Sequence, residues 1–286
     1  MTRRVFAQTT SAAAAAAATT PGKLPIKKAI LLSMIEGGGS LKEKFEIAKE
    51  AGFDAMEVGN VPTMQEAEEI KKASDDAKFP IHGIMNMEHW KSPLSSPDPA
   101  VAQKTVDSMK SSLQQAKLFG ASTVLLVPAV VNPEVRYEEA WKRSQPLIKS
   151  LIPEAEKNKV IIAVENVWNK FLLSPMEMAH YVDQFKSPWV RSYFDVGNVL
   201  LYGYPQDWIR TLGKNRIAKV HLKDFKFAKR QAEFVNLRDG ELGWKEVHKA
   251  LGEIGYNGYA TVELSKGDLA YLKDVAHRVD LILEGA

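Results

Sequence analysis

The chain of 286 residues contains no cysteine. This absence excludes disulfide bonds, thiolate nucleophiles and every zinc site that depends on cysteine ligands. No run of about eighteen apolar residues occurs, so we expect no segment of the mature chain to span a membrane. The net charge is only +3, and Lys and Arg are interspersed with Asp and Glu. Because there is no basic stripe with interleaved aromatic residues, we expect no nucleic-acid partner.

Hydrophobic residues make up 45% of the chain and charged residues 26%, the ordinary balance of a soluble globular protein. The length fits either one large barrel domain or two small domains. Short apolar runs alternate with segments of helical periodicity, and no Ser/Gly linker separates two halves. The runs end at or near Ser33, Val58, Ile84, Val127, Glu165, Asp195, Lys223 and Glu263. The sequence therefore predicts an α/β fold, a single (β/α)8 TIM barrel over residues 26–286.

Several of the expected helices have clear boundaries in the sequence. Gly120 follows a periodic apolar segment that begins at residue 99, and glycine is the usual residue just past a helix end. Ser174 precedes a proline at the first helical turn, a typical helix start. The helical segment 137–158 contains Pro146 and Pro153, which we expect to bend or divide it.

Residues 1–25 differ in composition from the rest of the chain. Arg3 and Arg4 form a twin-arginine pair, and a run of alanines follows from Ala12 to Ala18. Twin-arginine export signals combine such a pair with a moderately apolar run. We therefore expect a signal that directs export to the periplasm. The alternative is a disordered leader of no targeting value on a cytoplasmic protein.

Four polar side chains end predicted strands. They are Glu165 in IIAVEN, Asp195 in VRSYFDVGN, His221 in IAKVHLKD and Glu263 in YATVEL. In a closed parallel barrel the C-terminal ends of all strands meet at one face, where active sites lie. Three carboxylates and one imidazole suit a divalent cation, with Mn²⁺ as our first expectation and Mg²⁺, Co²⁺ or Zn²⁺ as alternatives. The competing interpretation is four unrelated strand-end residues.

Strand parity refines this expected site. Side chains alternate between the two faces of a strand, so Ala163 shares a face with Glu165, and Thr261 with Glu263. These small residues, one step below each glutamate, should leave space for a ligand inside the barrel. Lys223 shares the parity of the histidine and is expected to face the barrel mouth.

Longer motifs occur around these residues. They are HWKSPLSSPDPAV after the third strand, SPWVRSYFDVGN at the sixth, VHLKDFK at the seventh and TVEL at the eighth. From Ala29 to its C-terminus the chain resembles the sugar isomerase/epimerase superfamily with the xylose-isomerase-like barrel. Within it, the chain is most similar to pentulose-phosphate 3-epimerases of the L-xylulose or L-ribulose 5-phosphate type. The resemblance implies metal ligands at Glu165, Asp195, His221 and Glu263, and a catalytic acid/base pair formed by the two glutamates.

Two positions depart from the free-ketose 3-epimerases of this superfamily. Those enzymes usually have a His where this chain has Asn198, and an Arg where it has Phe227. The DVGN motif instead resembles the phosphopentulose branch, and we assign Asn198 and Lys223 to substrate binding. An exported enzyme would rarely meet sugar phosphates, so an unphosphorylated or oxidised sugar is the alternative substrate.

The expected chemistry is proton abstraction from a carbon next to a carbonyl, through an enediolate that a divalent ion stabilises. Epimerisation then needs a second carboxylic acid on the opposite face of the sugar. Glutamates from strands five and eight, on opposite sides of the barrel, would suit this division. Glu57, His82 and Trp90 are further candidates for contacting the sugar. The alternatives are that Glu57 simply lies at the rim, that His82 is a hydrogen-bonded core imidazole, and that Trp90 is a packed aromatic residue.

Three other functions remain open from the sequence. A lyase or dehydratase would use the same metal site on a keto-sugar and expel a leaving group. A base-excision endonuclease shares this barrel but needs a histidine-rich trinuclear zinc site, and only His82 and His221 lie near strand ends. A sugar-binding barrel without catalysis would not need all four ligands. The expected partner is a small sugar, and a homo-oligomer is left open.

Overall fold

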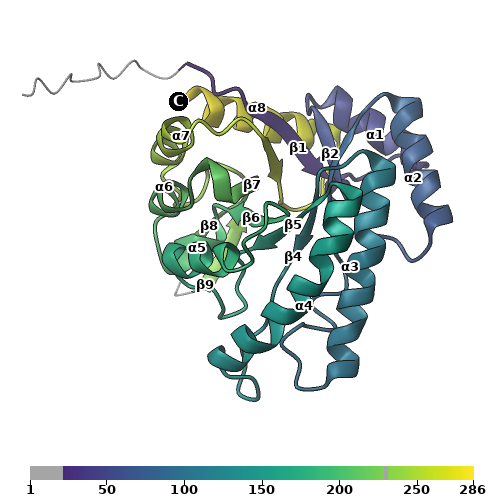
Figure 1. Ribbon diagram of the computed structural model, residues 1–286. Helices are drawn as coiled ribbons and strands as arrows, with labels where there is room; N and C mark the ends of the chain where they lie inside the picture. The colour runs from purple at the N-terminus through teal and green to yellow at the C-terminus, as the bar shows by residue number, and fades with distance from the viewer. Residues whose placement is uncertain (1–21, 229–230) are drawn as a thin grey trace, which may run out of the picture.

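The computed structural model describes residues 22–228 and 231–286. Eight parallel strands form a closed barrel, in which β10 closes the ring between β7 and β1 (Figure 1). The barrel strands are β1 (Lys27–Leu31), β2 (Ala55–Gly59), β3 (Ile81–Met85), β4 (Thr123–Leu126), β5 (Ile161–Glu165), β6 (Val190–Asp195), β7 (Ile217–Leu222) and β10 (Tyr259–Val262). The predicted single (β/α)8 barrel is therefore confirmed, and each strand ends within two residues of its predicted end.

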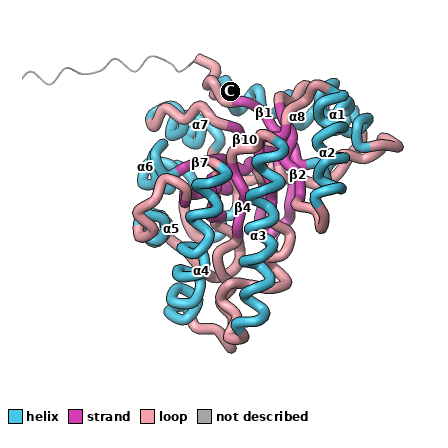
Figure 2. The backbone as a smooth tube through the Cα atoms, turned by 45° about the vertical axis from the view of Figure 1, so that its right-hand side comes forward, coloured by secondary structure: helices cyan, strands magenta, loops and turns pink. Residues whose placement is uncertain are grey.

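A helix follows each barrel strand in the chain, and the helices surround the strands (Figure 2). They are α1 (Leu41–Glu50), α2 (Met64–Ala77), α3 (Pro99–Phe119), α4 (Tyr137–Asn158), α5 (Pro175–Asp183), α6 (Pro205–Arg216), α7 (Trp244–Glu253) and α8 (Leu269–Glu284). Five of them begin after a Ser, Thr or Asp whose side chain accepts a backbone N–H of the first turn. These caps are Ser40, Thr63, Asp98, Ser174 and Asp268.

Of the two effects expected from the prolines within residues 137–158, a bend or a division of the helix, the division is wrong. Helix α4 is continuous over this range, although Pro146 and Pro153 lie inside it. Each proline removes one backbone hydrogen bond. The helix nevertheless buries one face, including Ile148 and Leu151, against the barrel. Most of the stability of a helix in a protein comes from such packing, which explains why the segment stays helical.

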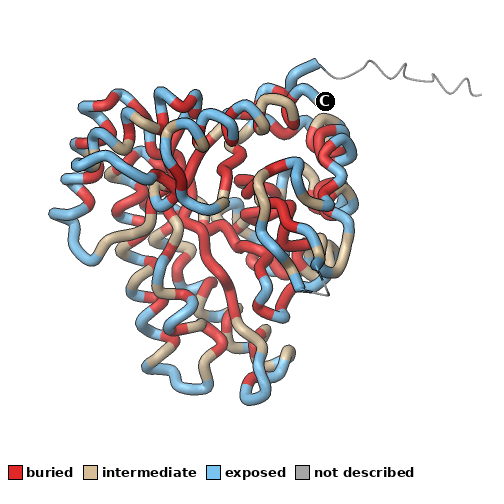
Figure 3. The backbone as a smooth tube through the Cα atoms, turned by 180° about the vertical axis from the view of Figure 1, so that it is seen from behind, coloured by how far each residue is buried: buried red, intermediate tan, exposed pale blue. Residues whose placement is uncertain are grey.

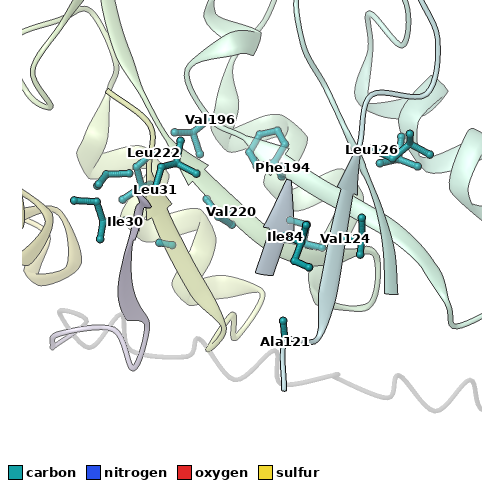
Figure 4. Close-up of a cluster of buried hydrophobic side chains, with 14 of the residues drawn as sticks. Ile30, Leu31, Ile84, Ala121, Val124, Leu126, Phe194, Val196, Val220 and Leu222 are labelled. Carbon is teal, nitrogen blue, oxygen red and sulfur yellow. The ribbon is translucent and has the colours of Figure 1, made fainter. Parts of the chain in front are cut away.

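Buried residues lie along the strands and the inward sides of the helices, whereas exposed residues lie on the outer turns (Figure 3). The large hydrophobic core lies between the sheet and the helices. Some of its members are drawn in Figure 4, among them Ile30, Ile84, Val124, Phe194 and Val220. A second, small cluster of Leu125, Ala163 and Tyr193 comes from the opposite strand parity and lies inside the barrel. The strand residues that point into the barrel therefore include the polar side chains of the site.

A two-stranded antiparallel hairpin follows β7, formed by β8 (Asp224–Ala228) and β9 (Gln231–Val235). The sequence analysis did not predict it. Buried Asp224 anchors its base, because its carboxylate accepts the backbone N–H of Arg238 at 2.9 Å and the indole N–H of Trp244 at 2.8 Å. The hairpin brings Phe225 and Phe234 to the side chain of Trp168.

Within the described residues, no helix is both long enough and apolar enough to cross a membrane. Residues 1–21 of the predicted export signal, which covers residues 1–25, lie outside the described residues. Export and the domain boundary at residue 26 therefore stay predictions.

Candidate functional site

The four predicted metal ligands converge at the C-terminal mouth of the barrel. Glu165 and Asp195 are the last residues of β5 and β6, His221 is the penultimate residue of β7, and Glu263 follows β10. One ligand atom from each residue lies within 4.8 Å of those of the other three. The pairing of Asp195 with His221 across β6 and β7 sets this arrangement. The alternative of four unrelated strand-end residues is not supported by this geometry.

The imidazole of His221 links three carboxylates. Its Nδ1 lies 2.9 Å from Glu165 Oε1 and 3.1 Å from Glu263 Oε2, and its Nε2 lies 3.2 Å from Glu57 Oε2. Burial alone would lower the pKa of His221, but the three carboxylates outweigh it and raise the pKa well above its ordinary value. Burial also raises the pKa of Glu165 to about 7, although the histidine opposes this shift. Both shifts arise in a buried cluster where several carboxylates surround one imidazole.

The two glutamates lie three strand positions apart in the ring of eight, one position short of the directly opposite placement that we expected. Their strands, β5 and β10, are separated in the sheet by β6 and β7. The two side chains nevertheless meet at the same nitrogen of His221, so they converge on one point of the barrel mouth from well-separated parts of the rim. If the two glutamates act on opposite faces of a sugar, their carboxylates must therefore reach those faces from this shared position, because their strands are not directly opposite each other.

The donor set fits a divalent cation. Lys223 Nζ lies 3.3 Å from Asp195 Oδ2 and 3.1 Å from Glu263 Oε2, so this ammonium neutralises part of the acidic cluster. The approach to Asp195 does not have hydrogen-bond geometry, and Oδ2 is a buried oxygen with no hydrogen-bond partner in the described chain. Such an oxygen is costly to bury without a partner. Three carboxylates and one imidazole, with an orphaned oxygen among them, are suited to a hard or borderline metal ion.

A network of amides fixes the orientation of Asp195. Its backbone N–H donates to Asn166 Oδ1 at 3.0 Å, and its Oδ1 accepts the backbone N–H of Asn198 at 2.7 Å. The side chain of Asn198 donates to the backbone carbonyl of Asn166 at 3.0 Å. Trp168 donates its indole N–H to the carbonyl of Asn198, also at 3.0 Å. Asn166 and Trp168 were missed in the sequence analysis, because neither belongs to the ligand pattern.

The space expected beneath the two glutamates is filled by Tyr193. Its ring packs against Ala163 and lies 4.3 Å from the ring of His221. The hydroxyl donates to Glu57 Oε2 at 2.5 Å and lies 3.1 Å from the hydroxyl of Thr261. The small residues therefore make room for this tyrosine, and the open space lies instead in a cavity that two of the four candidate metal ligands line.

The open space is a cavity of about 190 Å³ at the mouth. Its lining residues are Met85, His89, Trp90, Glu165, Val167, Trp168, Asn198, Lys223, Phe234 and Glu263. Three of the predicted substrate-binding residues, Trp90, Asn198 and Lys223, thus line the same cavity as the two glutamates. Glu57 and His82 do not line it. Glu57 is completely buried against His221, and His82 lies deeper, with its Nε2 2.9 Å from the hydroxyl of Thr261.

His89 is a cavity residue that the sequence analysis missed. Its Nδ1 accepts the backbone N–H of Val127 at 3.3 Å, so the proton of the neutral ring is on Nε2. Burial lowers the pKa of His89 to about 4, and the ring is therefore neutral near pH 7. It lies four residues beyond the end of β3, next to Trp90, and the HW dipeptide was the only signal of its position.

The chain belongs to the family of xylose isomerase-like TIM barrels, because the model of this family matches residues 45–283. L-ribulose-5-phosphate 3-epimerase UlaE of Escherichia coli O1:K1 / APEC is 23% identical over 234 residues, which cover 78% of this chain and 81% of that protein. The predicted superfamily is confirmed.

Solved structures agree on the fold. The structure of L-ribulose 3-epimerase aligns with a TM-score of 0.76 and 17% identity, covering 91% of this chain and 95% of that one. D-psicose 3-epimerase, solved in the presence of D-fructose, aligns with a TM-score of 0.74 and 19% identity, covering 90% and 97%. These relatives and neighbours are sugar epimerases, and epimerases are isomerases.

Proposed function

We propose that this protein is a divalent-metal-dependent sugar isomerase that acts as an epimerase or aldose–ketose isomerase. The convergence of Glu165, Asp195, His221 and Glu263 beside a sugar-sized cavity is the observation that carries the proposal. The membership of the chain in the xylose isomerase-like family and its likeness to sugar epimerases support it. Mn²⁺ is the proposed ion, because oxygen ligands with one imidazole suit it.

The same four residues would hold the ion, which when bound supplies a Lewis acid for the negative charge that develops on the substrate oxygens. Glu165 and Glu263 each have a second carboxylate oxygen beside the one directed at His221. In this proposal, one glutamate removes the proton from the carbon next to the carbonyl, and the other returns a proton to the opposite face. Asn198 and Lys223 orient the sugar oxygens, and Trp168 and Trp90 exclude water from the mouth.

Deuterium exchange tests this function directly. Purified full-length protein is loaded with Mn²⁺ and incubated in D₂O with a panel of ketoses, and NMR follows deuterium at the carbon next to the carbonyl. We expect incorporation together with a new epimer or aldose. The metal-stripped protein is the control and should give neither. Incorporation that leads to an unsaturated sugar would instead support the lyase or dehydratase alternative, and no incorporation into any ketose would contradict both.

A further inference from the structure

Three aromatic side chains from separate segments of the chain line the cavity. Trp90 follows β3, Trp168 follows β5, and Phe234 belongs to β9 of the hairpin. Their exposed fractions are 51%, 38% and 55%. Large apolar side chains that are exposed together at one cavity typically mark a binding surface. We call these three residues the aromatic wall.

The aromatic wall is held in place by its own contacts. The rings of Trp168 and Phe234 are stacked with centroids 5.5 Å apart, and buried Phe225 packs edge-on against Trp168 at 5.3 Å. The hydrogen bond from the Trp168 indole to Asn198 fixes the ring further. An ordered aromatic surface of this kind suits the apolar C–H face of a sugar, or an apolar group attached to it.

The charge of the cavity does not favour a phosphate. Lys223 is the one cation among the described residues that line it, and Asp195 and Glu263 already engage its ammonium group. Three ligand carboxylates balance this ammonium and a divalent ion, so the described residues that line the cavity leave no positive charge for a phosphate dianion. The remaining polar groups, from Asn198 and His89, are neutral, and neither has the charge of the Arg or Lys that usually binds phosphate.

The position where this fold usually binds phosphate has an acidic residue at its helix N-terminus. In many TIM barrels a phosphate binds at the loops after the last two strands, near a helix N-terminus. Here the hairpin follows β7, and the carboxylate of Asp268 caps α8 by accepting the backbone N–H of Tyr271 at 3.0 Å. Lys266 in the same loop is exposed and is not among the residues that line the cavity.

A neighbouring cavity of about 520 Å³ opens beside Glu57 and shares Met85 with the first. Its charged lining residues among the described ones are Glu57, Glu66, Glu69 and a single lysine, Lys44. This balance is acidic, so the second cavity offers no phosphate site either. Its other walls are largely aliphatic.

Resting on the proposed function, we infer that the substrate is a neutral, unphosphorylated keto-sugar that packs against the aromatic wall. This sets the chain apart from the L-ribulose-5-phosphate 3-epimerase that it resembles in sequence. The neutral donors and the aromatic wall replace the cationic contacts that a phosphate would need. This substrate class concerns the part of the sugar that lies away from the metal ion, and the proposed metal chemistry stays the same.

Matched pairs of free and phosphorylated ketoses test the inference separately from the proposed function. The Mn²⁺-loaded full-length protein is given L-ribulose, L-ribulose 5-phosphate and further free and phosphorylated ketose pairs in D₂O. We expect exchange into free ketoses with kcat/KM at least about tenfold above their phosphates, a difference of about 1.4 kcal/mol. Preferential exchange into the phosphates would overturn the inference and leave the function standing. Exchange into neither member of any pair would overturn both.

Variants of the aromatic wall give a second measurement. Trp168→Ala and Phe234→Ala should each raise KM for the free ketose by about three- to tenfold, because an aromatic contact contributes about 0.5–1.5 kcal/mol. Tyr204→Ala, at an aromatic residue with 66% exposure that does not line the cavity, is the matched control and should leave KM unchanged. Lys266→Ala and the double variant Lys229→Ala/Arg230→Ala should also leave activity unchanged. Unchanged KM in both wall variants, or loss of phosphate turnover in a lysine variant, would overturn the inference.

Discussion

His221 is the residue on which the candidate metal site depends most, because its Nδ1 contacts both glutamates. We predict that His221→Ala greatly reduces the metal content while the barrel remains folded, since the ligands lie at strand ends rather than in the packed layers below. Elemental analysis and circular dichroism measure the two effects. His277→Ala, at an exposed position on α8, is the control. Equal metal content in His221→Ala and wild type would remove this residue from the site.

The two glutamates should be separable by isotope exchange. Glu165→Gln and Glu263→Gln keep the side-chain size and one oxygen ligand, but neither amide accepts a proton at neutral pH. We expect each variant to lose turnover by about 10² to 10⁴, whereas one of them should still exchange the substrate proton with D₂O from its own side. NMR measures exchange and product formation together. Full activity in either variant would contradict a catalytic role for that glutamate.

At the residue scale, the position of Glu165, Asp195, His221 and Glu263 at the ends of short apolar runs was enough to predict that they converge. Strand parity placed Ala163 and Glu165 on the inner face. Parity also places Tyr193 on the same face as Asp195, but it could not predict that this ring packs against Ala163 and reaches Thr261, so that it fills the space beneath the glutamates. His89 was missed because its position depends on the path of a loop that has no periodicity.

At the element scale, the turn after β6 depends on Gly197. A Cβ at this position would lie 2.6 Å from the backbone carbonyl oxygen of Lys223, so the two chain segments could not approach as they do. We predict that Gly197→Ala destabilises the protein by about 1–3 kcal/mol, the usual cost of overpacking. Chemical denaturation measures this change. Gly39→Ala, where the nearest atom is a flexible carboxylate oxygen at 3.4 Å, is the control.

An equal loss of stability in the two glycine variants would show that the close approach at Gly197 has no energetic consequence. If the approach matters, the Gly197 variant should also bind less metal, because Gly197 lies between Asp195 and the backbone of Asn198 that holds it. The control variant should keep its metal content.

The hairpin β8–β9 shows where element prediction from this sequence failed. Phe225 and Phe227 alternate with polar residues as a strand requires, but the residues between the two strands are not the Asn-Gly or Asp-Gly pair that signals a tight turn. The barrel strands themselves were predictable because each is a short apolar run followed by a helical segment, and five of those helices begin after a Ser, Thr or Asp cap. The hairpin supplies Phe234 to the aromatic wall, so the missed element is the one that shapes the substrate side of the site.

At the scale of the whole molecule, the buried histidines make stability depend on pH. Burial holds the pKa of His89 at about 4, whereas an unfolded histidine has a pKa of about 6.5. Between these values the unfolded chain binds more protons, so the free energy of unfolding falls as the pH is lowered from about 6.5 to about 4. His82, with a pKa lowered to about 3, acts in the same direction.

We therefore predict that His89→Asn flattens this dependence by up to about 1.4 kcal/mol per pH unit. Chemical denaturation of both proteins at several pH values from 7 to 4.5 measures it. His277→Ala, at an exposed position on α8, is the control variant. A variant slope as steep as that of wild type would mean that His89 takes up its proton in the folded state.

If residues 1–25 are the predicted export signal, they determine where the protein works and therefore which substrates it meets. Changing Arg3 and Arg4 together to Lys should leave the protein in the cytoplasm of a bacterium with a working twin-arginine pathway, since that pathway recognises the arginine pair. Fractionation and immunoblotting of wild type and the double variant measure the distribution. Sugar phosphates are kept inside cells by their charge, so export of the wild type would agree with a neutral substrate. If the wild type never reaches the periplasm, or the double variant still does, the export prediction is wrong. The preference for neutral sugars would then depend on the aromatic wall and the charge of the cavity alone.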